Sequence, residues 1–325
     1  MFHWKGVGRM NTPEEEYLSA GQIALLPDQE AIRFYREHGW WVSPVCIESD
    51  LLDDACYGTE RYYAGERDWP LMVNVGIGWT PAEQARIRTS DYLSLQMEEF
   101  RRLVQHPIVP AMAARLAGTS EIRLFHDQLL YKSPSDPAST TAIGWHTDKS
   151  YWRSCTSVNM LTAWVPLQDC TADMGPLAVF DGSHQWSHGD DLQNFGSREL
   201  GPIEERLRAA HGDAEPVVIE LRRGQVSFHH CRTIHGSRPN VSSNVRIACA
   251  IHYQDADNRF NATRLPDGRT PTHINDMLCR RGADQWPDYA DPDVCLRLWP
   301  PTAAVDAASS PVARANPSLP RAVNR

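Results

Sequence analysis

Long apolar runs are missing from this 325-residue sequence. A membrane-spanning helix needs about 20 apolar residues, so we expect no membrane partner. The start of the sequence also lacks the apolar stretch and small-residue cleavage site of a secretory signal. The eight cysteines form no CxxC pair. This argues against a Cys-ligated zinc or iron–sulfur site and favours reduced thiols in a cytoplasmic protein.

Positive charge is scarce relative to negative charge. The 32 Lys and Arg stand against 41 Asp and Glu, which gives a formal net charge of −9. A nucleic-acid partner is not expected, because phosphate binding needs a basic face. No P-loop, GxGxxG, HExxH or GxSxG motif occurs in a suitable context. What the sequence does hold is 13 His and 11 Trp, which suit metal chemistry and aromatic pockets but are equally compatible with ordinary surface and core.

The first part of the chain predicts helices. Asp28 is a suitable N-cap for a helix that ends near His38, where Gly39 can adopt the left-handed conformation of a helix stop. A short strand is expected at 40–42. The remaining expectations before residue 120 are helices at 49–63, 90–105 and 107–116 and a Gly- and Pro-punctuated loop at 65–81.

From residue 121 the pattern changes to short β-branched and aromatic runs bounded by Gly, Pro, Asp or Ser. Such runs predict a β-sandwich or barrel rather than alternating βαβ units. We therefore expect a polar lead-in, one domain and a disordered tail, over residues 1–27, 28–300 and 301–325. Within the domain we expect a helical support (28–120), a β core (121–255) with an insert (184–216) that carries a helix over 202–211, and a C-terminal wrap (256–300).

The segment Gly144-Trp145-His146-Thr147-Asp148 holds a candidate metal-binding pair. Alternate side chains of a strand point to one face, so His146 and Asp148 would project together. They would supply two corners of a 2-His-1-carboxylate triad, which leaves open positions on Fe(II) for a cosubstrate and O₂. Such a pair is a weak signal by itself in a chain with 13 His.

A third ligand must come from a distant strand, and His235 in His235-Gly236-Ser237 is the candidate. Arg246 follows eleven residues later inside a predicted strand. A buried Arg is costly unless it meets a carboxylate, either an internal Asp or Glu or the far end of a dicarboxylate cosubstrate. In combination with the histidines and Asp148 the second option is preferred, with Ser237 donating to the same carboxylate.

Taken together, these segments resemble the phytanoyl-CoA dioxygenase family of Fe(II)/2-oxoglutarate-dependent oxygenases over roughly residues 28–255. The motifs that carry the resemblance are Gly39-Trp40-Trp41-Val42, Tyr131-Lys132, Trp145-His146-Thr147-Asp148, Trp164-Val165-Pro166-Leu167-Gln168-Asp169, Met174-Gly175-Pro176-Leu177, Asp181-Gly182-Ser183-His184, and His235-Gly236-Ser237 with Arg246. One departure is Asp181, where the family usually has Pro, in a turn that is structural.

The resemblance implies a mainly β fold with supporting helices and a double-stranded β-helix core of jelly-roll or cupin type. It implies a catalytic Fe(II) held by His146, Asp148 and His235, and 2-oxoglutarate held by Arg246 and Ser237, with O₂ as the oxidant. The implied reaction hydroxylates, or otherwise oxidises, an unactivated C–H of a small biosynthetic metabolite and releases succinate and CO₂. Asp148 argues against halogenation, because halogenating relatives carry Ala or Gly at that position.

Further candidates have weaker support. Gln128 and Trp164 are candidates for the cosubstrate pocket, and His126, Lys149, Tyr151 and Trp152 are candidates for substrate contact. A polar interior or core packing is the competing interpretation for His126, Gln128 and Trp164. The related ectoine hydroxylases share Trp152 but differ in the three residues before it, so ectoine is a doubtful substrate. His229 and His230 must face opposite sides of a strand, and both are expected not to bind the metal.

A cupin-like metal-binding protein without oxygenase activity remains the competing functional class, either as a sensor or binding module or as an isomerase. An isomerase of this type would not need Arg246. The expected partner is a small molecule, and a homodimer is one compatible assembly. The loops expected at the barrel mouth are 65–90, 149–155, 186–215 and 256–300.

Overall fold

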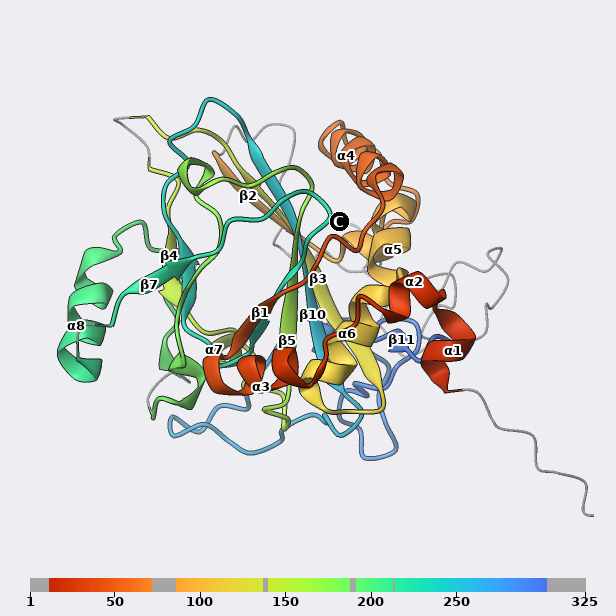
Figure 1. The fold of residues 1–325 in the computed structure, drawn as a ribbon. Coiled ribbons are helices and arrows are strands. Elements are labelled where there is room, and N and C mark those ends of the chain that lie inside the picture. Colours follow the sequence, from red (N-terminus) through yellow and green to blue (C-terminus); the bar gives the residue numbers. More distant parts are fainter. Residues whose placement is uncertain (1–11, 72–85, 137–139, 188–190, 213, 303–325) are drawn as a thin grey trace, which may run out of the picture.

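Two antiparallel sheets form the jelly-roll core of the computed structural model, which describes residues 12–71, 86–136, 140–187, 191–212 and 214–302 (Figure 1). The large sheet contains β1 (Trp40–Val42), β2 (Ile87–Asp91), β3 (Ile122–Lys132), β5 (Leu161–Pro166), β8 (Ser227–His230), β10 (Arg246–Asp255) and β11 (Arg297–Trp299). Its order is β1-β8-β5-β10-β3-β11, and β2 also pairs with β3. The small sheet, in the order β4-β9-β6-β7, contains β4 (Ile143–His146), β6 (Ala178–Phe180), β7 (Pro216–Val218) and β9 (His235–Ser237). The prediction of a β core of jelly-roll type is confirmed.

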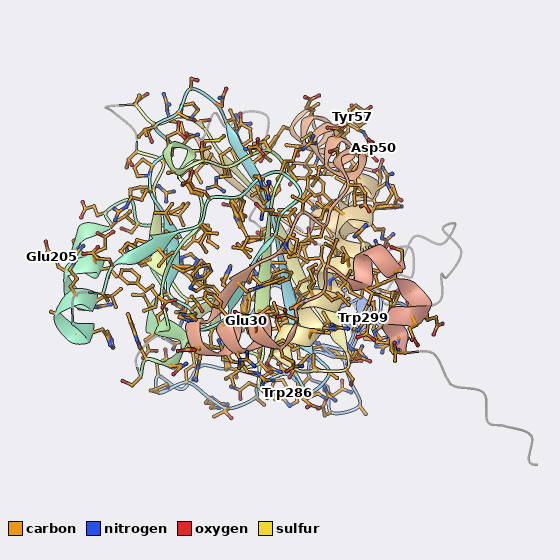
Figure 2. All side chains as sticks on the ribbon, viewed as in Figure 1. Glu30, Asp50, Tyr57, Glu205, Trp286 and Trp299 are labelled. Carbon is orange, nitrogen blue, oxygen red and sulfur yellow. The ribbon has the colours of Figure 1, made fainter. Side chains whose placement is uncertain are left out.

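Helices cover the outer faces of both sheets. On the side of the large sheet lie α1 (Pro13–Tyr17), α2 (Ala20–Ile23), α3 (Gln29–His38), α4 (Ser49–Tyr63), α5 (Glu98–Gln105) and α6 (Ile108–Ala117). The short α7 (Asp148–Tyr151) follows β4, α8 (Gly201–His211) lies beside β4 and β7, and α9 (Asn275–Leu278) belongs to the C-terminal segment. Short 3-10 turns cover Leu93–Leu95, Ala172–Met174 and Ser183–Gln185. Side chains fill the space between helices and sheets, whereas Tyr57 and Glu205 project outward (Figure 2).

The predicted start of α3 is confirmed in detail. The Asp28 carboxylate accepts a hydrogen bond from the Ala31 backbone N–H at 2.9 Å, and Gly39 ends the helix with a φ of +77°. Capping of this kind fixes both ends of a helix from local sequence alone. The helices expected at 49–63 and 107–116 also form, as α4 and α6.

The strands of the large sheet divide their side chains between two environments. On β5 the outward residues Leu161, Ala163 and Val165 belong to the main apolar core, which α6 also enters. The inward residues Thr162 and Trp164 line a cavity between the sheets. Burial of the outward residues stabilises the fold by about 25 cal/mol per Å² of apolar surface. Because the outward face provides this stability, the inward face can carry polar side chains.

The helix predicted over 90–105 is wrong in its first half. Residues 87–91 instead form β2, with Asp91 opposite Gln128 of β3. Tyr92 then takes a φ of +59°, and the helix α5 begins only at Glu98. The backbone N–H of Glu98 donates a hydrogen bond to the Asp68 carboxylate. The spacing of apolar residues from Tyr92 onward is typical of a helix. The hydrogen bonds of the preceding residues with β3 instead fix a strand there.

The β core also extends beyond the expected range 121–255. Strands β1, β2 and β11 all lie outside that range and join the large sheet. The stretch 12–27 is more than a polar lead-in, because Leu18 and Leu26 are buried in the main core. Nearly all of the tail predicted to be disordered, from residue 303 onward, lies outside the described residues. Within the described part of the chain, no helix is long and apolar enough to cross a membrane.

Candidate active site

The inner face of β3 and β10 carries polar side chains in opposed pairs. Arg246 lies opposite Lys132 in the strand register, and His252 lies opposite His126 at the other end of the same ladder. Because side chains alternate along a strand, these residues share the face that looks toward the small sheet. The inner face therefore has a cationic end and an imidazole end.

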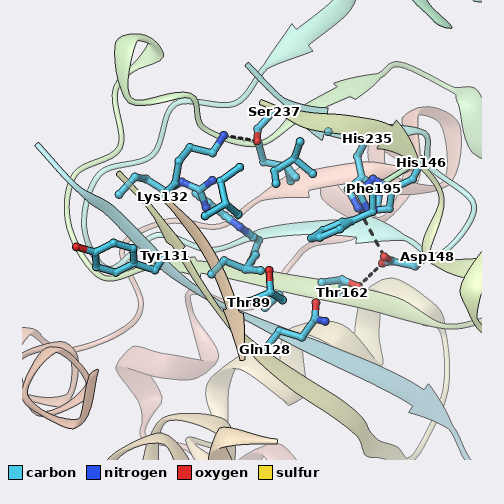
Figure 3. Close-up of a pocket in the computed structure, with 18 of the residues that line it drawn as sticks. Thr89, Gln128, Tyr131, Lys132, His146, Asp148, Thr162, Phe195, His235 and Ser237 are labelled. Carbon is cyan, nitrogen blue, oxygen red and sulfur yellow. Dashed lines mark hydrogen bonds and ion pairs between the residues drawn. The ribbon is translucent and has the colours of Figure 1, made fainter. Parts of the chain in front are cut away.

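His146, Asp148 and His235 converge between these two ends (Figure 3). His146 ends β4 and pairs with His235, the first residue of β9, so that the ring centroids are 4.1 Å apart. One potential ligand atom from each of the three residues lies within 4.8 Å of the others. The expectation that Asp148 continues the strand is wrong, because β4 ends at His146 and Asp148 is the first residue of α7. The turn into α7, not strand alternation, brings the carboxylate to the histidines.

Backbone carbonyls orient both imidazoles. Nδ1 of His146 lies 2.8 Å from the carbonyl oxygen of Gly144, and Nδ1 of His235 lies 2.9 Å from that of Thr233. A carbonyl only accepts, so each Nδ1 carries the proton and each Nε2 keeps its lone pair. Metal-binding histidines are fixed in this way in metalloproteins.

The Asp148 carboxylate is held on one oxygen. Its Oδ2 accepts a hydrogen bond from the Thr162 hydroxyl at 2.6 Å, and its Oδ1 lies 3.6 Å from Nε2 of His235. Oδ1 therefore faces the same space as the imidazole lone pairs. Two neutral nitrogens and one carboxylate oxygen form the facial donor set that suits Fe(II) in oxygenases.

Burial and neighbouring charges place these groups in the protonation states that bind a metal. Burial lowers the pKa of His146 and of His235, which favours neutral imidazoles. Burial also raises the pKa of Asp148, but His235 and the nearby His229 and His252 lower it further, so that it lies well below its usual range. The three groups fit a divalent cation.

Sequence reasoning missed how close His229 lies to this group. Its Nε2 is 3.3 Å from Oδ2 of Asp148, and its ring centroid is 4.2 Å from that of His235. His230 faces away, and its Nδ1 accepts the Arg232 backbone N–H. Strand alternation predicts that only one of the two histidines can enter the site, but it does not tell which.

At the cationic end, Arg246 is only 3% exposed and its Nε and Nη1 have no hydrogen-bond partner. No ion pair joins it to a carboxylate of the described residues, so the internal Asp or Glu considered from sequence is not there. Its guanidinium carbon lies 5.3 Å from the centroid of the Trp164 ring. Burial lowers its pKa to about 10. The group remains charged at neutral pH, and the residues that the structure describes supply no counter-ion.

Lys132 adds a second buried basic group beside Arg246. Its amino group donates to the Ser237 hydroxyl at 2.5 Å and to the carbonyl oxygen of Arg238 at 2.8 Å. Burial, and next the charge of Arg246, hold the pKa of Lys132 well below its usual range. The charged Arg246 guanidinium with this amine beside it fits a small organic anion, and the negative charge of such a ligand favours the protonated form of Lys132.

Two adjoining cavities meet at the His-Asp-His group. The inner one contains the cationic end and Trp164. The outer one has a volume of about 890 Å³, within the range of ligand sites, and extends past His126 and His252. Gln128 lines both, and its amide nitrogen donates to Oδ1 of Asp91 at 2.6 Å. The cavities suit a small cosubstrate and a larger substrate.

Three of the four residues expected to contact substrate do line the outer cavity, namely His126, Tyr151 and Trp152. Lys149 does not line either cavity, because its ammonium donates to the carbonyl oxygens of Cys155 and Ser157, each at 2.8 Å. It ties its own loop together, and the expectation for it is not carried further.

Sequence reasoning missed several residues that line the outer cavity. They are Asp91, Phe195, His252, His273 and Asp276. Phe195 comes from the insert and lines both cavities, with its ring centroid 5.0 Å from that of His146. The expectation that the insert and the C-terminal wrap contribute loops at the mouth is consistent with these contacts.

The segment around Phe195 is hydrogen-bonded to β4, the strand that carries His146. The backbone N–H of Gly144 donates to the carbonyl oxygen of Phe195 at 3.3 Å. A Cβ at position 144 would lie only 2.0 Å from the carbonyl oxygen of Asn194. Only glycine permits this close approach of two backbones.

A jelly roll with a buried His-Asp-His group between an anion site and a larger cavity defines a non-haem iron oxygenase that uses a 2-oxo acid. Residues 60–248 match the family model described as Phytanoyl-CoA dioxygenase (PhyH), which is more than half of the chain. The chain belongs to this family, whose members are Fe(II)- and 2-oxoglutarate-dependent oxygenases, and the resemblance predicted from sequence is confirmed.

Individual relatives are distant. The chain is 24% identical over 247 residues to the peroxisomal phytanoyl-CoA dioxygenase of Rattus norvegicus, covering 71% of this chain and 69% of that protein. It is 27% identical over 187 residues to an ectoine dioxygenase of Bordetella bronchiseptica, covering 53% of this chain and 59% of that protein. These relatives differ in substrate, so membership alone does not identify the substrate here.

Solved structures repeat the fold. The non-haem α-ketoglutarate-dependent carbocyclase SnoK from nogalamycin biosynthesis matches with a TM-score of 0.56 at 28% identity, covering 72% of this chain and 86% of that chain. EctD from S. alaskensis, solved with 2-oxoglutarate and 5-hydroxyectoine, matches with a TM-score of 0.57 at 20% identity, covering 72% and 78%. At that identity the EctD match shows the fold only.

Proposed function

We propose that this protein is an Fe(II)- and 2-oxoglutarate-dependent dioxygenase that hydroxylates, or otherwise oxidises, an unactivated C–H of a small metabolite. The observation that carries the proposal is the buried Arg246 guanidinium, which has no carboxylate partner among the described residues and lies with Lys132 beside the His-Asp-His group. A metal-binding module without oxygenase activity would have no use for such an anion site.

In this proposal His146, Asp148 and His235 hold the iron. The carbonyl oxygens of Gly144 and Thr233 keep both Nε2 lone pairs directed inward, and the Thr162 hydroxyl keeps Oδ1 of Asp148 available. When bound, Fe(II) and 2-oxoglutarate activate O₂ and supply the oxidation, with succinate and CO₂ as coproducts. Asp148 occupies the position that halogenating relatives leave open, which favours oxygen transfer.

Arg246 and Ser237 bind the distal carboxylate of 2-oxoglutarate. The Ser237 hydroxyl accepts from Lys132, so its own proton is free to be donated to that carboxylate. Trp164 packs near the guanidinium and limits its rotation. Gln128 stands at the boundary of the two cavities and separates cosubstrate from substrate.

The substrate occupies the outer cavity, with His126, Tyr151 and Trp152 among its contacts. The Phe195 ring lies against His146 and keeps water away from the space between the cavities. Exclusion of water strengthens the electrostatic contacts in the site and limits side reactions.

The decisive test is succinate formation from 2-oxoglutarate by the purified protein with Fe(II), ascorbate and O₂. We expect slow formation without substrate, and loss of it in His146→Ala and in Arg246→Ala. Arg246→Lys serves as a conservative second variant, and Arg33→Ala, an exposed arginine on α3, serves as the matched control. Iron binding without succinate formation across a broad substrate panel would favour the binding-module class and reject the proposal.

A further inference from the structure

One buried carboxylate in the wall of the outer cavity has an oxygen without a hydrogen-bond partner. Asp91 ends β2, is 4% exposed and lines this cavity. Its Oδ1 accepts a hydrogen bond from Gln128, but its Oδ2 has no partner. Among the described residues no Lys or Arg forms an ion pair with it. An unpaired buried carboxylate is costly, which points to a ligand that completes it.

The neighbouring Asp127 shows what a structural carboxylate looks like in the same place. It too is fully buried, but its oxygens accept the Ser94 backbone N–H at 3.0 Å and the Ser94 hydroxyl at 2.5 Å. Asp127 fastens the turn after β2 to β3. Asp91 makes no such bond to a turn. The residue lies in the wall of the outer cavity, where its Oδ2 is covered and has no partner.

A second unused polar group lies nearby. His126 is two residues from Gln128 on β3, on the same face, and therefore roughly 7 Å further along the cavity wall. It is 6% exposed, and neither ring nitrogen has a hydrogen-bond partner. Its ring centroid lies 4.2 Å from that of His252 and 5.0 Å from that of His273. Burial lowers the pKa of His126 well below its usual range, so the ring is neutral and offers one donor and one acceptor.

Two other roles for these residues fail. Only the His146, Asp148 and His235 group brings three possible ligand atoms within 4.8 Å among the residues that the structure describes, so the imidazoles near Asp91 do not form a second metal site. Of the other two acids that line the cavity, Asp148 belongs to the proposed metal site, and Asp276 already accepts the Tyr289 hydroxyl and the His273 backbone N–H. Asp91 is thus the acid whose oxygen is left for a ligand.

On the basis of the proposed function, we propose that Asp91 binds a protonated amine of the substrate, and that His126 binds a hydroxyl or carbonyl group of the same molecule. An ammonium supplies both the missing charge and the missing donor, which a neutral alcohol supplies only in part. The substrate class is therefore a small amine that also carries an oxygen function.

The test measures binding to the holoenzyme, loaded with Fe(II) and 2-oxoglutarate under argon, by isothermal titration calorimetry. The probes are glucosamine, 2-aminocyclohexanol and tyramine, each with its N-acetyl derivative and the alcohol that replaces the amine. We expect at least one amine to bind about tenfold or more tightly than both neutral partners. In Asp91→Asn this preference should disappear, whereas Glu205→Gln, an exposed acid on α8, should retain it.

The proposal is overturned if no amine is preferred by the wild-type protein, a result that does not depend on whether a variant folds. It is also overturned if folded Asp91→Asn keeps the preference. Succinate formation by the wild type is measured in parallel, without substrate and across a broad substrate panel. If it is absent throughout, the proposed function fails; if it is present while amines are not preferred, only the amine assignment fails.

Discussion

The two ends of the β3–β10 ladder share one backbone geometry and differ in chemistry. The inner end presents Lys132 and Arg246 and is enclosed by strands of both sheets. The outer end presents His126 and His252 and is enclosed largely by loops and short helices, including Tyr151 of α7, Phe195 and the segment after Thr272. Rigid strands can fix one small anion, whereas loops can fit substrates of many shapes. The comparison separates what binds the cosubstrate from what selects the substrate.

Arg246→Ala should have the largest effect and should be confined to the inner end. Removing one partner of a buried charged contact costs about 2–5 kcal/mol, so the concentration of 2-oxoglutarate for half-maximal rate should rise about 100-fold. Titration of succinate formation against 2-oxoglutarate measures it. An equal loss of substrate affinity would show that the two ends are not separate.

Asp91→Asn tests whether the carboxyl at the outer end is unpaired, through the pH dependence of the free energy of unfolding. Burial, and next the charge of Asp127, raise the pKa of Asp91 to about 7, against the usual 3.8, while the Gln128 hydrogen bond opposes this shift. Ionisation is therefore disfavoured in the folded protein, and this carboxyl lowers stability as pH rises from about 4 to about 7.

The variant lacks this penalty. Relative to wild type, its free energy of unfolding without ligands should increase by roughly 2–3 kcal/mol between pH 5 and pH 8. Chemical denaturation of both proteins at each pH measures the difference. The contribution of Asp127 to the pH dependence cancels, because this residue is present in both proteins. A difference that does not change with pH would mean that Asp91 is already ionised and paired.

Thr162→Val tests the boundary between the ends. The hydroxyl donates to Asp148 and lies 2.7 Å from Nδ1 of His252, so it contacts both the metal group and the outer cavity. Loss of a group that orients a metal ligand typically costs 10–100-fold, and we expect about tenfold weaker Fe(II) binding. Competition with a fluorescent chelator measures the affinity. Unchanged affinity would assign Thr162 to packing alone.

Lys149→Met should have the smallest effect and should leave both ends intact. The ammonium contacts only carbonyl oxygens of its own loop, so the change should lower the free energy of unfolding by about 1–2 kcal/mol. Thermal unfolding measures this. A changed preference among amines would instead return Lys149 to the substrate site.

The sequence predicts the inner end better than the outer end. His146, His235 and Arg246 were identifiable because each lies in a short motif whose chemistry is fixed by metal and carboxylate binding. The start of α3 was predictable because Asp28 and Gly39 act locally. In both cases the determining contacts are near in sequence or chemically unusual.

The outer end depends on contacts between distant segments. Asp91 was assigned to a helix, since only pairing with Gln128 reveals that it belongs to a strand. His229 and His230 could not be distinguished without the register of β8 against Thr162. Phe195 lies in a polar insert, and no local pattern predicts that its ring reaches His146. In each case the position of the residue depends on contacts between distant segments, and the local sequence pattern does not contain this information.

The close approach of Gly144 to the Asn194 carbonyl has a consequence for protein engineering. The insert is a natural place to exchange residues in order to change which molecules the enzyme accepts, because Phe195 forms a wall of the outer cavity. A transplanted segment must still present a bare carbonyl to position 144, and the recipient must keep glycine there, since a methyl group would lie 2.0 Å from that oxygen. Libraries that randomise the insert should therefore hold Gly144 and the backbone of 194–195 constant and vary only the side chains that reach the cavity.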